Sequence, residues 1–356
     1  MRLGIFGLPQ SGKTTLFNAL THGEQPIGEM SGKIEVHMGV VDVPDPRLDN
    51  LSELFHPKKN TYAKVTYADI AGLDGNAGKS GISGILINEL SQMDGFIHVV
   101  RCFVDESIPH TFNTVDPQRD IEAMDSDFII NDLISVERKL ERLSEEFRRG
   151  AGRDKSIVQK EITLFERIHE TLSNEIPLRD IEISDEEKSV LSGFGMLSQK
   201  PMLVVLNLDE GQEAPEINYD HQNTIIVSLQ CKLEMEISQL PEDESELFLE
   251  EYGIEEPSLN RMIRFSYDLL GLQSFFTAGE KEVRAWTIKK GATAPEAAGV
   301  IHSDLQKGFI RAEAITYEEL MELGSLVEAK NKGKLRLEGK KHIVQDGEVL
   351  TIRFNL

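Results

Sequence analysis

Short apolar runs recur along the first 230 residues and alternate with stretches of helical periodicity. Five runs cover residues 3–6, 65–69, 95–100, 202–206 and 224–227, and each is bounded by turn-forming residues. Near-continuous apolar strands separated by helices are typical of a parallel sheet that is covered on both faces. The pattern therefore predicts an α/β fold.

A different pattern fills residues 133–172. Apolar residues recur there at spacings of three and four in two segments, which Gly150 and Gly152 separate. Two such helices form an antiparallel hairpin, either as a protruding coiled-coil arm or as two ordinary helices that face the core. The strict spacing and the charged flanks favour the arm. The apolar positions are Leu133, Val136, Leu140, Leu143 and Phe147, followed by Val158, Ile162, Phe165, Ile168 and Leu172.

The charge changes sign along the chain. Of 38 basic and 61 acidic residues, which give a net charge of -23, residues 272–356 hold 13 and 12, whereas residues 1–271 hold 25 and 49. This shift predicts a domain boundary near residue 275. The acidic balance excludes a protein whose whole surface binds nucleic acid or an anionic membrane, because phosphates repel it. A local basic contact in the last domain stays open.

The sequence contains no sign of membrane insertion or export. No apolar stretch approaches the roughly 20 residues that span a bilayer, and the first residues are typical of a strand rather than of a signal peptide. Cys102 and Cys231 form no CxxC pair, which favours a reducing compartment. We expect a cytoplasmic monomer with no membrane partner.

The candidate chemistry lies directly after the first predicted strand. Residues 7–14 read GLPQSGKT and fit the P-loop pattern G-x-x-x-x-G-K-[ST]. Glycines let backbone N–H groups turn toward phosphate oxygens, and the following helix adds its positive end. Lys13 is predicted to bridge the β- and γ-phosphates during catalysis, and Thr14 to hold Mg2+ through its hydroxyl. The predicted phosphate-binding residues are Pro9, Gln10, Ser11, Gly12, Lys13, Thr14 and Thr15.

Further parts of a nucleotide site follow in order along the chain. Asp69 and Gly72 match the D-x-x-G of a GTPase switch, in which Asp69 would reach Mg2+ through water and the Gly72 N–H would sense the γ-phosphate. Residues 207–210 read NLDE where GTPases carry the base-reading N-K-x-D, so Glu210 replaces the guanine-reading aspartate and specificity for guanine is in doubt. Ser228 opens a segment at the position of a base-contacting loop.

These motifs and the C-terminal sequence resemble the YchF or Obg-like ATPase family, a branch of the translation-factor-class GTPases. The resemblance implies hydrolysis that accepts ATP at least as well as GTP, with the base selected by Asn207 and backbone groups. It also implies a P-loop domain over residues 1–125 and 198–274, a helical coiled-coil insertion over 126–197, and a C-terminal TGS domain of β-grasp type over 275–356. The matching segments are residues 7–21, 43–48, 69–73, 98–103, 275–279, 281–291, 297–302 and 307–313.

Catalysis departs from the usual GTPase pattern. Leu73 stands where many GTPases carry the glutamine that orients the attacking water, and leucine cannot polarise water. His110 matches a family histidine proposed for that role, although a lone loop histidine is more often a plain surface residue. Lys33 replaces the switch I threonine that closes over Mg2+, and residues 74–84 are also altered. We expect intact nucleotide binding with slow or altered hydrolysis.

Six cations cluster within 12 residues of the last domain and form either a solvated turn or a surface that faces RNA or the ribosome. Together with the coiled-coil arm, such a surface could contact a structured partner such as the ribosome. The leading hypothesis is an ATP-hydrolysing switch linked to the ribosome or RNA, and the alternative is a nucleotide-gated binder with negligible turnover. A small-molecule kinase is disfavoured, because D-x-x-G and N-x-x-E are motifs of switch proteins. The six cations are Lys330, Lys332, Lys334, Arg336, Lys340 and Lys341.

Overall fold

The computed structural model describes residues 1–23, 25, 36–70, 84–150, 153–251 and 256–355. The chain forms two compact units. The first joins Met1–Gly39 to Thr66–Leu259, and the second joins Val40–Val65 to Asn260–Leu356.

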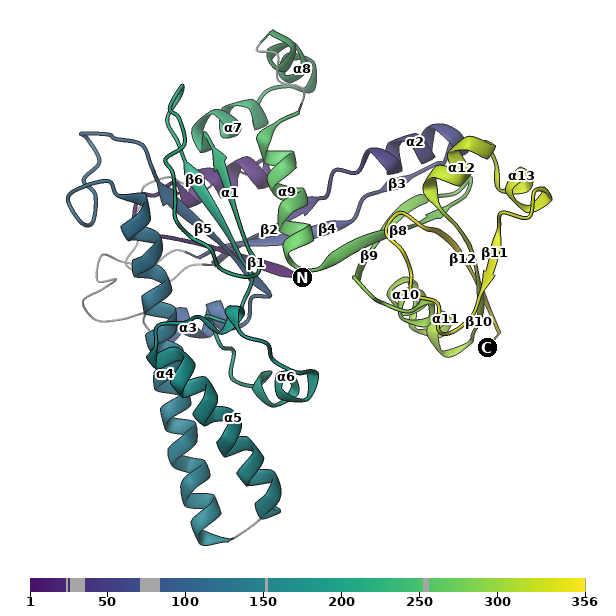
Figure 1. The fold of residues 1–356 in the computed structure, drawn as a ribbon. Coiled ribbons are helices and arrows are strands. Elements are labelled where there is room, and N and C mark those ends of the chain that lie inside the picture. The colour runs from purple at the N-terminus through teal and green to yellow at the C-terminus, as the bar shows by residue number, and fades with distance from the viewer. Residues whose placement is uncertain (24, 26–35, 71–83, 151–152, 252–255, 356) are drawn as a thin grey trace. The chain divides into compact units, whose positions relative to one another are not determined.

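A six-stranded sheet forms the centre of the first unit (Figure 1), in the order β2-β4-β1-β5-β6-β7. The pairs β1–β4, β1–β5, β5–β6 and β6–β7 are parallel, as the five apolar runs predicted. Every residue of β5 and β6 is buried, so both faces of the sheet are covered. The edge strand β2 escaped prediction because its residues alternate between exposed and half-buried. The strands are β1 (Arg2–Phe6), β2 (Val36–Asp42), β4 (Lys64–Ile70), β5 (Gly95–Arg101), β6 (Met202–Asn207) and β7 (Thr224–Leu229).

Aromatic packing forms the core on one face of this sheet. Phe6, Phe96 and Phe128 are fully buried and their ring centroids lie 5.0 to 5.4 Å apart. Apolar residues of α3 and of the first half of α4 join them. The helices of this unit are α1 (Lys13–Thr21), α3 (Gly84–Ser91), α4 (Pro117–Arg149), α5 (Lys155–Ser173), α6 (Asp185–Leu191), α7 (Cys231–Ser238) and α8 (Glu242–Glu251), and α9 (Ser258–Leu269) leads into the second unit.

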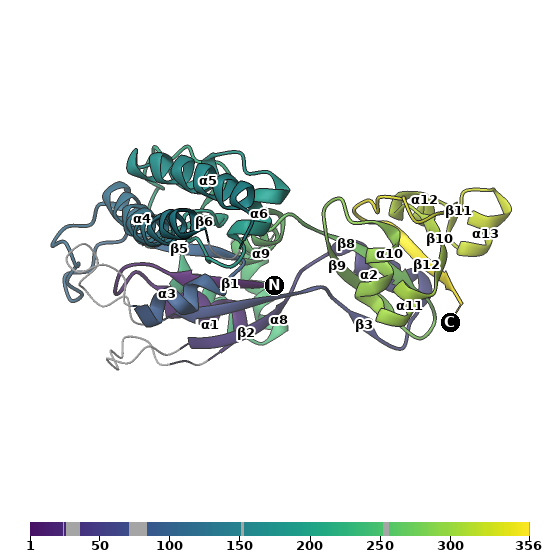
Figure 2. The same ribbon diagram turned by 90° about the horizontal axis from the view of Figure 1, so that it is seen from below.

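The predicted helical arm is confirmed. Helices α4 and α5 lie side by side (Figures 1 and 2), and the predicted apolar positions of both helices form a core separate from that of the sheet. Helix α4 is continuous for 33 residues, and its first half packs on the sheet. The expected boundary at residue 126 therefore lies inside a helix.

The second unit contains a mixed sheet in the order β11-β10-β12-β8-β9-β3. The expected boundaries assigned residues 40–65 to the nucleotide-binding domain, whereas the structure groups them with the C-terminal residues, because β3 pairs with β9 and the Arg47 guanidinium donates to Asp346 at 2.7 Å. The elements are α2 (Pro46–Phe55), β3 (Asn60–Thr61), β8 (Leu272–Ala278), β9 (Val283–Lys289), α10 (Ala294–Ile301), α11 (Ser303–Lys307), β10 (Phe309–Ile315), α12 (Tyr317–Leu323), α13 (Leu326–Asn331), β11 (Arg336–Glu338) and β12 (Val349–Phe354).

The expected fold class, a parallel α/β sheet with a helical region and a separate C-terminal domain, is confirmed. Its finer assignment as a TGS domain of β-grasp type stays a prediction. Across the described ranges, no helix is both long enough and apolar enough to cross a membrane.

Candidate nucleotide-binding site

The P-loop connects β1 to α1, and its geometry requires glycine at two positions. Gly7 has φ +149°, and a Cβ atom there would lie 2.3 Å from the Val99 carbonyl oxygen. Gly12 caps α1 with φ +100°, and its Cβ would lie 2.2 Å from Asn207 Nδ2. A side chain at either position would collide with its neighbours and force a strained backbone. The loop therefore has the backbone that the phosphate-binding pattern predicts.

Polar side chains that start α1 meet the end of β4. The Lys13 ammonium donates to the Leu8 carbonyl at 2.8 Å across the loop, and the Thr14 hydroxyl donates to Asp69 Oδ2 at 2.9 Å. Burial raises the pKa of Asp69, while the Thr14 hydroxyl and the Lys13 charge oppose this rise. The structure thus brings together Lys13, Thr14 and Asp69, as the sequence predicted.

Two buried oxygen atoms in this region lack a hydrogen-bond partner among the described residues. One is Asp69 Oδ1, on a side chain that is 1 % exposed, and the other is the Ser11 hydroxyl. Buried polar atoms are normally satisfied. The two atoms mark positions where a bound group or water would complete the site.

Asn207 ties three segments together rather than projecting into open space. Its Nδ2 donates to the Ser11 carbonyl at 2.9 Å, and its Oδ1 accepts from the Cys231 N–H at 3.1 Å. The side chain therefore holds the P-loop against the start of α7. This geometry favours a positioning role beside the predicted base-reading role.

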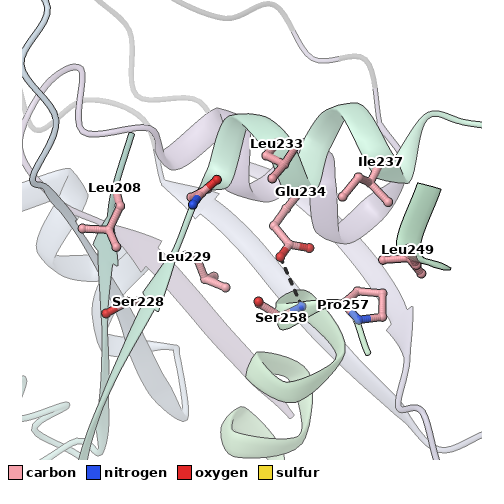
Figure 3. A pocket seen from close by; sticks show the side chains of 10 residues that line it. Leu208, Ser228, Leu229, Leu233, Glu234, Ile237, Leu249, Pro257 and Ser258 are labelled. Atoms are coloured by element: carbon pink, nitrogen blue, oxygen red, sulfur yellow. Dashed lines mark hydrogen bonds between the residues drawn. The ribbon is translucent and has the colours of Figure 1, made fainter. Parts of the chain in front are cut away.

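The other two predicted base-reading residues lie on the paired strands β6 and β7 or directly after them. Glu210 is exposed in the turn after β6, where its N–H donates to Asp209 Oδ1 at 2.9 Å. Ser228 lies on β7 and lines a cavity of about 170 Å³ (Figure 3), together with residues of α7, α8 and the start of α9. Glu234 in this cavity accepts from the Ser258 N–H at 3.1 Å and so caps α9. The cavity residues do not include Glu210.

The predicted catalytic His110 is surrounded by protein groups. Its side chain is 5 % exposed, and Nε2 lies 2.9 Å from Asp120 Oδ2, at ion-pair distance without hydrogen-bond alignment. Nδ1 accepts from the Phe112 N–H at 3.1 Å. Orienting a water would require the ring to leave these contacts, so the catalytic role of His110 stays a prediction.

Three further predictions lie outside the described residues: Gly72 as the γ-phosphate sensor, Leu73 in place of the catalytic glutamine, and Lys33 in switch I. Sequence reasoning also missed a triad in which Arg179 and Asp125 are buried and Tyr219 is half-buried. Arg179 Nη2 donates to Asp125 Oδ1 at 2.7 Å and to the Tyr219 hydroxyl at 2.6 Å. These three residues fit no periodic or spacing pattern, so no sequence signal marks them.

Comparisons with known proteins agree with this geometry. Residues 2–139 match the family model described as "50S ribosome-binding GTPase", and residues 272–355 match the YchF-GTPase_C model, described as "Protein of unknown function (DUF933)". The fission yeast protein titled "Structure of the Schizosaccharomyces pombe YchF GTPase" superposes with a TM-score of 0.85 at 28% identity, covering 99% of this chain and 97% of the other.

Curated relatives match over almost the whole length. The "Ribosome-binding ATPase YchF" of Bacillus subtilis (strain 168) is 40% identical over 365 residues, covering 99% of both chains. The protein of the same name from Pasteurella multocida (strain Pm70) is 41% identical and covers 100% of this chain and 99% of its own. With this likeness and a complete P-loop, the chain belongs to the YchF family.

Proposed function

We propose that this protein is a nucleotide-dependent switch that binds and hydrolyses ATP and acts on the ribosome. The observation that carries the proposal is the P-loop with its Thr14–Asp69 contact, at the carboxyl edge of a parallel sheet where ligands bind in such folds. The relatives named ribosome-binding ATPases support the nucleotide and the partner.

The oxygen ligands of the site fit Mg2+. This ion usually takes one or two protein oxygens together with waters and phosphate oxygens. The Thr14 hydroxyl and the Asp69 carboxylate supply such oxygens. Among the described residues, Asp69 Oδ1 has no hydrogen-bond partner. Bound Mg2+ would neutralise negative charge that develops on the phosphates. Thr14 would hold it directly and Asp69 through water.

Lys13 and the P-loop backbone would bind the phosphates, and Asn207 would keep that loop in register with the base-binding side. Base selection would then depend on Glu210 and on backbone groups near Ser228. Because the guanine-reading aspartate is replaced, we propose that ATP binds at least as tightly as GTP.

Ribosome contact would use the basic cluster of the C-terminal domain, the proposed TGS domain. Lys334 pairs with Glu319 at 3.0 Å and Arg336 with Glu348 at 2.7 Å, so these two surface cations already have carboxylate partners within the domain. The remaining four are exposed, and no described carboxylate lies within ion-pair distance of them. Free surface cations are suited to RNA phosphates, and a ribosomal partner implies a cytoplasmic protein, which we propose is a monomer. The four are Lys330, Lys332, Lys340 and Lys341.

Nucleotide titrations test the proposal directly. We expect measurable binding of ATP, at least as tight as that of GTP, and a loss of at least about tenfold in Lys13→Ala. Lys188→Ala, in an exposed turn of α6, serves as the control and should bind like the wild type. Absence of ATP binding, or a strong preference for GTP, would contradict the proposal.

A second candidate function is a nucleotide-gated ribosome binder with negligible hydrolysis. The contacts that hold His110 between Asp120 and the Phe112 N–H favour it. Single-turnover ATP hydrolysis with and without ribosomes separates the two functions. Hydrolysis that ribosomes accelerate supports the switch, and ATP binding without hydrolysis in either condition supports the binder.

A further inference from the structure

Arg101 is a buried cation whose charge serves a single loop. It is the last residue of β5 and is 3 % exposed. Its guanidinium donates to the carbonyl of Phe103 at 3.1 Å, to that of Ile108 at 3.1 Å from two nitrogens, and to that of Asp105 at 3.3 Å. All these acceptors lie in residues 103–108, so one side chain fixes the course of the whole loop.

The same loop is tied to the predicted base-reading segment. Arg101 lies opposite Asn207 in the β5–β6 register, and the Cys102 N–H donates to the Asn207 carbonyl at 2.9 Å. The Gln212 amide donates back to the Cys102 carbonyl at 2.8 Å. Asn207 in turn contacts the P-loop at Ser11. The loop that Arg101 holds is therefore fixed against the predicted base-reading segment, and the Asn207 side chain makes the separate contact with the P-loop.

A turn closes the tip of the loop. Asp105 Oδ1 accepts from the N–H and the hydroxyl of Ser107 at 2.9 and 2.6 Å. Together with the Cys102 contacts, this places the start of the loop beside residues 207–212, at the end of β6. Its apolar Val104 is 76 % exposed, which leaves uncovered surface at this edge.

We propose that Arg101 is a positioning residue that shapes residues 102–108 into one wall of the base-binding side of the nucleotide site. The inference rests on the proposed function, since it concerns the same site. Among the described residues, the hydrogen bonds of the Arg101 guanidinium go to residues 103–108 and none goes to the P-loop. Its loss should therefore weaken recognition of the base while leaving the grip on the phosphates intact.

The test compares ATP with tripolyphosphate, a ligand that keeps the phosphates and lacks the base. Two constants are measured in the presence of Mg2+ for the wild type, Arg101→Met and Arg101→Lys. They are the dissociation constant of ATP and the inhibition constant of tripolyphosphate as a competitor of ATP binding. We expect Arg101→Met to weaken ATP by at least about tenfold and tripolyphosphate by less than about twofold. Arg101→Lys keeps the charge but has fewer hydrogen-bond donors, so its loss of ATP affinity should lie between those of the wild type and Arg101→Met. If Arg101→Met does not fold, the comparison is made with Arg101→Lys alone.

Lys200→Met is the matched control. Lys200 is another partly buried cation that donates to main-chain carbonyls, those of Leu90 and Ser91, but it precedes β6 and so lies at the opposite edge of the sheet. The Lys200→Met variant should leave the constants for ATP and for tripolyphosphate unchanged. Unchanged ATP binding in the Arg101 variants, an equal loss of both ligands, or the same loss in Lys200→Met would overturn the inference. A wild-type protein that binds neither ligand would instead overturn the proposed function on which it rests.

Discussion

Asp69 carries one carboxylate oxygen that the described protein groups do not satisfy. Oδ2 accepts from Thr14, while Oδ1 is buried without a partner. In an interior where nearly all polar atoms are paired, such an atom is expected to bind water or a metal-bound water. At the scale of single residues, this atom is the strongest sign that the site is built for a cation.

Replacing Asp69 by asparagine should therefore weaken Mg2+ use. The neutral amide keeps the shape but loses the charge, and groups that support a metal typically affect its affinity by about 10–100-fold. The measurement is the Mg2+ concentration that half-saturates ATP binding. Asp94→Asn, whose carboxylate accepts from the Arg2 N–H at the other edge of the sheet, is the control. An unchanged half-saturation in Asp69→Asn would exclude this role.

His98 makes the stability of the fold depend on pH. Its ring stacks on Phe6 at 4.7 Å and its Nδ1 has no partner, and burial lowers its pKa to about 4. In the unfolded chain the pKa of His98 has its ordinary value near 6.5. Between pH 4 and 6.5 the unfolded chain therefore binds a proton that the folded chain does not bind. The contribution of neutral His98 to the free energy of unfolding is complete above pH 6.5 and is lost as the pH falls toward 4.

Urea unfolding of the wild type and of His98→Leu at two pH values measures this effect. Comparing the two proteins cancels the other titrating groups. Between pH 7.5 and pH 5 the wild type should lose about 2 kcal/mol of unfolding free energy more than the variant. Parallel losses in both proteins would show that His98 does not carry the effect.

At the scale of elements, one carboxylate fixes the root of the arm. Asp132 of α4 accepts from the N–H groups of Leu197 and Ser198 at 2.9 and 2.7 Å, and from the Ser198 hydroxyl at 2.7 Å. The side chain is buried, and burial raises its pKa to about 6. The segment that returns from the arm to β6 is thus held by α4 itself.

Asp132→Ala should destabilise the first unit by about 2–4 kcal/mol, because two buried N–H groups lose their acceptor. Chemical denaturation measures this change. Glu137→Ala, at an exposed position of the same helix and 3.6 Å from His169, should cost less than about 0.5 kcal/mol. Similar losses in the two variants would contradict the role of Asp132.

The elements also illustrate what periodicity can and cannot predict. The apolar runs predicted β1, β4, β5, β6 and β7, and the three-and-four spacing predicted the arm. Both predictions were possible because the burial of these elements is visible in the local sequence pattern. Strand β3 is only two residues long and pairs with β9, more than 200 residues away, so no local signal marks it. The position of residues 40–65 in the second unit was missed for the same reason.

The candidate site divides along similar lines. Motif spacing predicted that Lys13, Thr14 and Asp69 would meet, since a strand, a loop and a helix with fixed spacing determine their geometry. It did not predict the internal contacts of His110 or the anchoring role of Asn207. Those depend on Asp120 and Cys231, which become neighbours only through the fold.

At the scale of the whole molecule, charge is segregated along the chain. Residues 1–271 carry a large excess of acidic side chains, which repel RNA. We therefore expect ribosome contact to use the four unpaired lysines described above in the C-terminal domain. Changing Lys330, Lys332, Lys340 and Lys341 to glutamine should weaken ribosome binding and reduce its log–log salt slope by up to about 3. Cosedimentation at several KCl concentrations measures the slope. Lys334→Gln, which removes a lysine already paired with Glu319, is the control. An unchanged slope in the quadruple variant would contradict the assignment.

The most direct test of the central claim is ribosome cosedimentation in two nucleotide states. The wild type is pelleted with ribosomes in the presence of either a non-hydrolysable ATP analogue or ADP, with Lys13→Ala in parallel. The account predicts that the bound fraction differs between the two nucleotides for the wild type and is the same for Lys13→Ala. Equal binding of the wild type in both states would contradict a nucleotide-dependent switch.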